Sequence, residues 1–380
     1  MRIAHIADLH IGKRLSGYDL REDQSYIFDQ MIEKMNEADV EAVLISGDIY
    51  DSSTPSAEAV GMFSELLNKL AAMDKEICII PGNHDSAGRL SFAAGLLNQL
   101  KIHIAGPYAG HVEKVVLNDA YGPVNFYLLP FIKPSMIRGF FDEPAKDYTD
   151  AVMKVLERED IRKDERNVIL AHQFITVGGF YEEHDLSQGG LNNVESFVFD
   201  NFEYVALGHI HKPSKAGRET CRYSGSPMVY SVNDDKYGSS FVVVDLKEKG
   251  TEPEVQTVPL KPLRRVCKIK GTFDELTDGD TLTGTKMDDY VQIVLTDTEA
   301  IPNVMERLRV GYPHILGLEL NGIYQEAAGT SQAADRSKSP LELAREFFLK
   351  QSGAEANECQ MEYLSRLIAD ICDTDEEEEA

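Results

Sequence analysis

The chain has 380 residues, which is more than one hydrophobic core usually accommodates, so two or three domains are expected. Hydrophobic residues make up 43% of the sequence and charged residues 27%, which is ordinary for a globular protein. The net charge of −26 argues against a nucleic-acid-binding surface that covers the whole molecule. The sequence shows no secretory signal, no Arg-rich leader and no apolar run near 18 residues, so it predicts a cytoplasmic protein without membrane spans.

The five cysteines are odd in number and form no CxxC pair, so neither a disulfide framework nor a zinc knuckle is expected. The negative charge is unevenly distributed. Residues 373–380 form an acidic run, which predicts a solvated tail, whereas residues 261–270 contain five cations. This basic run could contact a nucleic-acid backbone or form the edge of a strand. A phosphodiester substrate is therefore not excluded, although this chain alone is expected to bind one weakly.

Short apolar strands recur along the chain, and each is followed by a turn that carries Asp, Asn or His. Five such strands are expected at residues 2–7, 42–45, 77–80, 168–171 and 204–207. The polar side chains after them are Asp8, His10, Asp48, Asn83, His84, Asp85, His172, His209 and His211. Further strands are expected at residues 112–117, 125–129, 223–230 and 240–245. Apolar spacing predicts three helices. One is expected at residues 21–38, one begins after a cap at residues 53–55, and one is expected at residues 89–100.

Alternation of strands with helices indicates an α/β sheet. Ligands of such sheets bind beyond the carboxyl ends of the strands. The five polar turns are therefore expected to meet at one edge of the fold. Carboxylate, imidazole and amide ligands without a thiolate suit Mn²⁺, Fe²⁺ or Zn²⁺. These side chains are too many for one ion, whereas two ions about 3.5–4 Å apart that share a carboxylate would form a hydrolytic clamp.

The order Asp-x-His, Gly-Asp, Gly-Asn-His-Asp, His and Gly-His-x-His resembles the calcineurin-like metallophosphoesterases. Residues 47–51, 204–213 and 223–227, with the late run at 339–348, narrow the resemblance to the SbcD family of bacterial exonuclease subunits. The similarity covers nearly the whole chain apart from the linker and the acidic tail. It implies a four-layer α/β sandwich in which two β-sheets are flanked by helices, with a small α/β capping domain and C-terminal helices.

The resemblance also implies a role for each residue of the site. The first ion would be held by Asp8, His10, Asp48 and His211, and the second by Asp48, Asn83, His172 and His209, both ions being Mn²⁺. His84 would act beside the leaving oxygen as a general acid or transition-state stabiliser, and Asp85 would hold its ring in one tautomer. From the residues alone, Asp85 could instead cap the following helix, and the two roles are compatible.

The remaining candidates match no part of this pattern. His5 lies inside the first strand and is predicted to pack in the core, whereas His184 is predicted at the surface. The isolated cations Lys13, Arg14 and Arg89 could approach a phosphate or simply be solvated.

Composition and the resemblance together divide the chain into five parts. These are a nuclease domain at 1–259, a capping domain at 260–325 that positions DNA, a linker at 326–339, helices at 340–372 and an acidic tail at 373–380. Within the capping domain, strands are expected at 266–269 and 290–295 and a helix at 301–310. The two amphipathic C-terminal helices could fold back on the capping domain or dock in the groove of a partner. The resemblance implies docking to SbcC, a long coiled-coil ATPase, and a homodimer within a heterotetramer.

The function implied by the resemblance is that of an ATP-dependent double-strand DNA exonuclease and single-strand endonuclease in repair, recombination and replication. Such an enzyme would process DNA ends and hairpins. A small-molecule phosphodiesterase or protein phosphatase of the same fold is the alternative, although neither needs a capping domain or terminal helices. A non-catalytic scaffold is a further alternative, but every expected ligand position is filled in this sequence.

Overall fold

The computed structural model describes residues 1–178, 192–278, 288–299 and 301–320, together with the single residues 345, 349, 360, 361 and 363. Two compact units are distinguished, residues 1–297 with 301–320 and residues 298–300 with 321–380. Everything below concerns the first unit. His184, the linker and tail, and nearly all of the helices expected at 340–372 lie outside the described residues.

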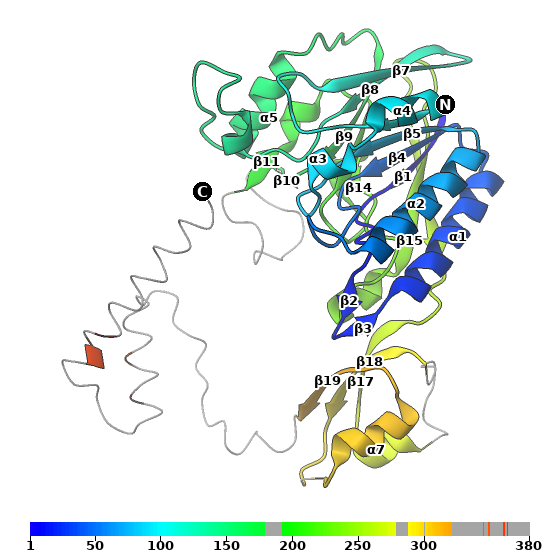
Figure 1. Cartoon of the computed structure of the whole chain (residues 1–380), viewed down its shortest axis with the longest axis vertical. Coiled ribbons are helices and arrows are strands. Elements are labelled where there is room, and N and C mark those ends of the chain that lie inside the picture. The colour runs from blue at the N-terminus through cyan, green and yellow to red at the C-terminus, as the bar shows by residue number, and fades with distance from the viewer. Residues whose placement is uncertain are drawn as a thin grey trace. The chain divides into compact units, whose positions relative to one another are not determined.

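The first of two six-stranded sheets contains the amino-terminal strands (Figure 1). In spatial order its strands are β16 (Glu254–Leu260), β15 (Ser239–Asp245), β1 (Arg2–Ile6), β4 (Ala42–Ser46), β5 (Glu76–Ile80) and β6 (Ile102–Ile104). β1, β4, β5 and β6 are parallel, and β15 joins β1 in antiparallel orientation. The expected strands at 2–7, 42–45, 77–80 and 240–245 are confirmed.

The second sheet holds the remaining strands of the site. In spatial order its strands are β13 (Ser214–Ala216), β14 (Arg218–Tyr223), β12 (Tyr204–Gly208), β9 (Arg166–His172), β8 (Gly122–Leu128) and β7 (Glu113–Asp119). Its four central strands, β14, β12, β9 and β8, are parallel. Apolar side chains from both sheets, including Leu44 and Cys78 from the first and Phe126 and Leu170 from the second, form one buried cluster. Because central strands are covered on both faces, their sequences read as continuous apolar runs.

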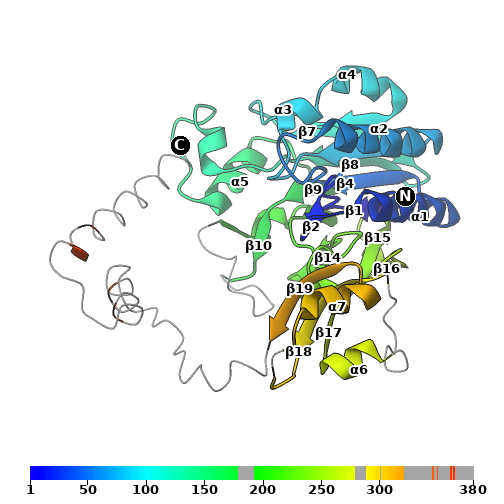
Figure 2. The same ribbon diagram turned by 60° about the horizontal axis from the view of Figure 1, so that its bottom comes forward.

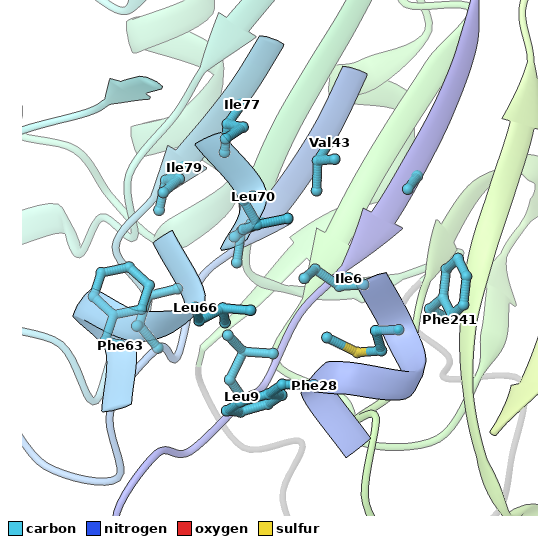
Figure 3. Close-up of a cluster of buried hydrophobic side chains, with 14 of the residues drawn as sticks. Ile6, Leu9, Phe28, Val43, Phe63, Leu66, Leu70, Ile77, Ile79 and Phe241 are labelled. Carbon is cyan, nitrogen blue, oxygen red and sulfur yellow. The ribbon is translucent and has the colours of Figure 1, made fainter. Parts of the chain in front are cut away.

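Helices cover the outer face of each sheet. α1 (Arg21–Glu37) and α2 (Ala57–Ala72) lie on the first sheet, where Phe28, Phe63 and Leu66 pack against β-strand residues such as Val43 (Figure 3). α5 (Tyr148–Glu157) packs on the second sheet. The order helix, sheet, sheet, helix confirms the expected four-layer sandwich.

Three local predictions are wrong. α2 is capped by Ser56, whose hydroxyl accepts a hydrogen bond from the Ala59 amide at 3.2 Å, rather than within residues 53–55. The helix expected at 89–100 is broken into short turns because Ala93 adopts a left-handed conformation with φ of 61°. These turns are α3 (Ala87–Leu90), α4 (Ala94–Leu97) and η1 (Asn98–Leu100). The strand expected at 223–230 ends at Tyr223, since Gly225 turns the chain with φ of 73°.

The described residues between 266 and 320 form a smaller sheet (Figure 2). This sheet has its own buried core. It contains the parallel strands β17 (Val266–Gly271), β18 (Tyr290–Leu295) and β19 (Ile315–Leu320), with helices α6 (Phe273–Thr277) and α7 (Val304–Gly311). The strands expected at 266–269 and 290–295 and the helix at 301–310 are confirmed within a few residues. We call these residues, 266–320 as far as described, the cap sheet. The domain boundaries predicted above stay predictions.

The basic run at 261–270 is largely engaged in structural contacts. Arg264 donates to Asp23 at 2.9 Å and to Glu22 at 2.6 Å, and so ties the start of the cap sheet to α1. Lys268 lies 3.0 Å from Glu319 on β19. The structure favours the strand-edge interpretation at Lys268, which lies on the edge strand β17, whereas Arg264 precedes that strand and binds α1.

Short elements complete the described chain. They are β2 (Arg14–Leu15), β3 (Tyr18–Asp19), η2 (Pro134–Ile137), β10 (Phe174–Thr176), β11 (Asn193–Glu195), η3 (Ser196–Phe199) and η4 (Val232–Tyr237). Within the described ranges, the helices are too short or too polar to cross a lipid bilayer.

Candidate metal centre

Turns at the carboxyl ends of five parallel strands meet across the two sheets. The Asp8 carboxylate, after β1, accepts a hydrogen bond from the His209 amide, after β12, at 3.0 Å. His172, at the end of β9, lies with Nδ1 2.7 Å from the carbonyl oxygen of Ser46 at the end of β4. These contacts join the strand ends of one sheet to those of the other, as the sequence predicts.

One group of donor atoms surrounds His10. Its Nε2 atom lies 3.0 Å from Nε2 of His211 and 3.6 Å from Oδ2 of Asp48. Ligand atoms of Asp8, His10 and His211 all lie within 4.8 Å of one another. All four side chains are largely buried.

A second group surrounds Asn83. Its Oδ1 atom lies 3.1 Å from Nε2 of His172 and 3.0 Å from Nδ1 of His209. Nε2 of His172 is also 3.3 Å from Oδ2 of Asp48. The same carboxylate oxygen of Asp48 therefore faces His10 in one group and His172 in the other.

The donor sets and their spacing fit divalent cations. Protein nitrogen and oxygen ligands bind such ions at about 2.0–2.2 Å, so two ligands of one ion lie roughly 3–3.6 Å apart. The separations of 3.0 Å between His10 and His211 and 3.3 Å between His172 and Asp48 fall in this range. Without a cation, such pairs of ring nitrogens and oxygens would place lone pairs against each other unless a proton lay between them.

Backbone strain is concentrated at the same residues. Asp8, His10, Asp48 and His209 all have positive φ, at 55°, 42°, 51° and 103°. Non-glycine residues in such regions cost about 1–3 kcal/mol each and persist where surrounding contacts over-determine them. Here the amides of Asp8 and His10 donate to the carbonyls of Gly47 and Asp48, at 3.0 Å each. The turns are therefore held in an unfavourable backbone conformation that directs their side chains into the centre.

Three glycines permit the close approach of these turns. A Cβ atom at Gly208 would lie 2.0 Å from the carbonyl oxygen of Ser46, and one at Gly82 would lie 2.2 Å from Oδ1 of Asp48. At Gly47 it would lie 2.4 Å from Nδ1 of His172. These separations are far below van der Waals contact, so only glycine fits.

Burial and neighbouring charges set the protonation of the centre. Burial raises the pKa of Asp8 to about 6, and His172 opposes that shift. Burial also disfavours ionisation of Asp48, yet His172 beside it holds the pKa of Asp48 below its usual value. Burial and then His172 lower the pKa of His209 to about 4, and burial and then His10 lower that of His211 to about 3. His209 and His211 are therefore neutral at pH 7, as metal ligands must be. Burial lowers the pKa of His172, but Asp48 beside it raises that pKa to about 9, so a cation bound there must displace a proton.

His84 lies at the edge of the centre, with 42% of its side chain exposed and Nε2 3.9 Å from Oδ2 of Asp48. Its Nδ1 atom is 3.0 Å from the carbonyl oxygen of Asp51. This geometry corrects the expectation that Asp85 orients the ring. Both oxygens of Asp85 instead accept backbone amides, from Gly82 and from residues 49 and 50, at 2.9–3.0 Å.

The expectation that Asp85 caps a helix is also wrong, since α3 has Ser86 at its N-cap position. Asp85 is half-buried and nevertheless accepts three hydrogen bonds. It clamps the turn after β4 to the turn after β5. The two turns it joins carry Asp48 and Asn83, so its contribution is to the shape of the centre.

Two family profiles match consecutive parts of the chain. One, described as calcineurin-like phosphoesterase, matches residues 1–213, and so contains every residue of the two donor groups. The chain belongs to the calcineurin-like phosphoesterase family. The second, described as the type 5 capsule protein repressor C-terminal domain, SbcD_C, matches residues 259–352. Calcineurin-like phosphoesterases are hydrolases, and the fold described above is the metallophosphoesterase fold.

A curated relative of this phosphoesterase is the SbcD subunit of nuclease SbcCD from Staphylococcus epidermidis (strain ATCC 12228 / FDA PCI 1200). The two are 29% identical over 378 residues, which cover 98% of this chain and 99% of the relative. The chain is thus a homologue of SbcD over its whole length.

Two solved structures also resemble it. The protein TT1561 of Thermus thermophilus is 12% identical to this chain, with a TM-score of 0.44. The match covers 68% of this chain and 99% of the TT1561 chain. A dimetal phosphatase from Danio rerio is 14% identical to this chain, with a TM-score of 0.41. The match covers 68% of this chain and 98% of the phosphatase chain.

Sequence reasoning missed several residues that shape the centre of this phosphoesterase. The carboxylate of Asp51 lies 3.4 Å from Nδ1 of His10. The backbone carbonyl of Asp51 contacts the ring of His84. Gln24 and Tyr230 are buried beneath His10. Asp51 lies within the run 47–51 that carries the family resemblance, whereas Gln24 and Tyr230 match no motif that points to the centre.

The remaining candidates have structural partners. His5 is fully buried and lies 2.8 Å from the hydroxyl of Tyr204, which confirms its prediction as a core residue. Arg89 donates to the carbonyl oxygen of Ser53 at 2.7 Å, and Lys13 lies 2.7 Å from Asp51.

Proposed function

We propose that this chain is the nuclease subunit of an SbcCD-like complex, which hydrolyses phosphodiester bonds of DNA with two divalent metal ions. One observation carries the proposal: Oδ2 of Asp48 lies 3.6 Å from Nε2 of His10 and 3.3 Å from Nε2 of His172. A single buried carboxylate thus faces both donor groups, as a ligand shared by two ions must. The name of the relative, a nuclease subunit, supports DNA as the substrate.

We assign the ligands as two sets that share Asp48. The first ion is assigned to Asp8, His10, Asp48 and His211, and the second to Asp48, Asn83, His172 and His209. When bound, two such ions act as Lewis acids on a phosphoryl oxygen and lower the pKa of the attacking water. A mixed set of carboxylate, imidazole and amide ligands, without sulfur, is consistent with Mn²⁺.

His84 is the proposed proton donor. Its Nδ1–H is held by the carbonyl of Asp51, which leaves Nε2 directed toward Asp48 at the edge of the centre. A ring fixed in this way, when protonated at Nε2, can donate to the leaving oxygen of a phosphodiester. Exposure of 42% of its side chain leaves it accessible to substrate and solvent.

The partners follow from the same resemblance. We propose that the helices at 340–372 dock to an SbcC-like coiled-coil ATPase and that the cap sheet positions DNA. We also propose a homodimer within a heterotetramer. The short turns at residues 87–100 expose Phe92, Leu96 and Leu100 at 82%, 69% and 60%, and exposed apolar side chains of this kind suit contact with a second copy of the chain. We also propose a cytoplasmic location, because DNA is the proposed substrate.

A hydrolysis assay with four substrates tests the proposal. Purified chain with Mn²⁺ is expected to cleave hairpin and blunt duplex DNA, with higher activity once the coiled-coil ATPase is added. Exclusive hydrolysis of a phosphoprotein or of a simple diester such as bis(p-nitrophenyl) phosphate would instead identify a phosphatase or a small-molecule phosphodiesterase. No hydrolysis of any of them with bound Mn²⁺ would favour a scaffold.

Truncation tests the proposed docking site. Removal of residues 340–380 is expected to preserve Mn²⁺-dependent hydrolysis of the simple diester and to abolish co-purification with the ATPase. Retained co-purification would contradict the assignment of those helices to the partner.

A further inference from the structure

We propose that Gln24 and Tyr230 are positioning residues, which fix His10 at the metal centre and join that ligand to the cap sheet. This inference rests on the proposed metal centre. Neither residue belongs to a motif recognised in the sequence, and they are 206 positions apart. Both are almost completely inaccessible, at 0% and 5% exposure.

Gln24 binds the backbone on both sides of His10. Its Nε2 atom lies 2.8 Å from the carbonyl oxygen of His10 and 3.2 Å from that of Leu9. Its Oε1 atom accepts a hydrogen bond from the amide of Gly12 at 3.2 Å. One amide side chain therefore holds both ends of a turn in which His10 has a φ of 42°.

Tyr230 supports the same turn from the other direction. Its hydroxyl donates to the carbonyl oxygen of Leu9 and accepts from Nε2 of Gln24, which lies 3.1 Å away. Its ring meets the ring of His10 edge-on with centroids 5.6 Å apart, and that of His211 at 6.1 Å. Tyr230 thus contacts the backbone before His10 and the rings of two proposed ligands of the first ion.

The pair also adjoins the contact between the cap sheet and the larger domain. Tyr230 belongs to a buried cluster with Leu20 and with Val266 and Tyr290 of the cap sheet. The hydroxyl of Tyr290 donates to Asp23 at 3.0 Å, one residue before Gln24 on α1. The turn of α1 that holds His10 is therefore the one to which the cap sheet is fastened.

These contacts offset a specific cost. Positive φ at His10 is unfavourable for a residue with a side chain, and relaxation of the turn would rotate the ring away from His211 and Asp48. Partners of this kind beyond the ligands typically change metal affinity by about 10- to 100-fold. The effect should fall on the first ion, because the described contacts of Gln24 and Tyr230 reach none of Asn83, His172 and His209.

Tyr230→Phe removes the hydroxyl and keeps the ring. Calorimetric titration of the metal-free full chain with Mn²⁺ is expected to show two ions in the wild type. In the variant, one of them binds about 10- to 100-fold more weakly. The electron paramagnetic resonance signal of a coupled manganese pair should accordingly give way to that of a single ion. Gln24→Met, which keeps volume but removes both polar atoms, is expected to act on the same ion.

Tyr312→Phe is a matched control, since the buried Tyr312 hydroxyl also donates to a backbone carbonyl, that of Leu276, at 2.8 Å. Thermal unfolding monitors folding of every variant. Unchanged affinity for both ions in folded Tyr230→Phe and Gln24→Met would overturn the positioning role alone. Failure of the wild type to bind two ions would overturn the metal centre as well.

A further variant tests the link between His10 and the cap sheet. Tyr290→Phe removes the hydrogen bond to Asp23 and is expected to weaken binding of the same ion by a few fold, with the other ion unaffected. Unchanged affinity for both ions in this variant would overturn the link between the cap sheet and His10.

Discussion

The Nε2 atoms of His10 and His211 lie 3.0 Å apart, although the two residues are 201 positions apart in the chain. Only one proton or one cation can lie between two ring nitrogens at this separation. Burial, followed by the neighbouring His10, lowers the pKa of His211 to about 3, so this ring is neutral at pH 7 and can offer a lone pair at Nε2. A divalent cation between the two nitrogens would accept a lone pair from each ring, and the first predictions follow from this arrangement.

Asp48→Asn removes the charge of the carboxylate proposed to bind both ions. Loss of a partner beyond the ligands already costs about 10- to 100-fold in metal affinity, so loss of a shared ligand is expected to exceed about 100-fold for at least one ion. Mn²⁺ titration and DNA hydrolysis measure the effect. Asp164→Asn, at an exposed carboxylate paired with Arg162, serves as the control and should change neither.

His84→Ala is expected to leave both ions bound and to lower DNA hydrolysis by about 100- to 10,000-fold, the usual contribution of a general acid. The physical reason is that its ring is held by the Asp51 carbonyl and lies 3.9 Å from the nearest oxygen of Asp48. His103→Ala, which removes a ring paired with Glu76, is the matched control and should retain activity. Loss of an ion from the His84 variant would make His84 a ligand.

Asp85→Asn separates clamping from catalysis. An asparagine side chain has one acceptor oxygen, whereas the Asp85 carboxylate accepts three backbone amides. Leaving buried donors unpaired costs about 1–3 kcal/mol, so the free energy of unfolding should fall by about that amount. Metal affinity should fall with it because the clamped turns carry Asp48 and Asn83. Normal stability with lost hydrolysis would instead point to a direct catalytic role.

Gly208→Ala tests the close approach of the two sheets. The new methyl group would lie 2.0 Å from the Ser46 carbonyl oxygen and 2.6 Å from Nδ1 of His172. Such overpacking typically costs about 1–3 kcal/mol, and it should also displace His172 and weaken the second ion. Thermal unfolding and Mn²⁺ titration measure both effects. Gly61→Ala, in α2 with open space around its Cβ position, is the control and is expected to stabilise the helix slightly.

A pH-dependent contribution to stability is expected from Asp119 and Arg166, which lie 2.5 Å apart with 4% and 3% of their side chains exposed. Burial opposes ionisation of Asp119, but Arg166 holds the pKa of that carboxyl well below its usual value. A depressed folded-state pKa stabilises the fold above the unfolded pKa of about 3.9, and this stability is lost as pH falls toward the folded pKa.

Asp119→Asn is therefore expected to lower the free energy of unfolding at pH 7 by about 3 kcal/mol, since it leaves the buried guanidinium of Arg166 without its carboxylate partner. The difference from wild type should shrink below pH of about 4. Denaturant unfolding across this range provides the measurement. Asp245→Asn, which breaks a more exposed pair with Arg2, should cost less than about 1 kcal/mol. A constant difference at every pH would contradict the assignment to the Asp119 carboxyl.

Much of the fold was predictable because its signals are local. The strand that ends before Asp8 and the strand that ends at His172 are buried on both faces, and a continuous apolar run is their direct signature. Helix α1 was predictable from the spacing of Ile27, Phe28 and Met31. By contrast, the break at Ala93 has no signature in residue type, because alanine normally favours a helix.

The amino-acid sequence by itself determined which chemical groups follow which strands, and parallel strands then required those groups to gather at one edge. Only the tertiary structure decided which atoms meet: that Asp51 rather than Asp85 holds His84, and that Gln24 and Tyr230 lie beneath His10. The physical reason is that apolar period and turn chemistry are properties of neighbouring residues. A hydrogen bond between residues dozens or hundreds of positions apart depends instead on how two sheets stack.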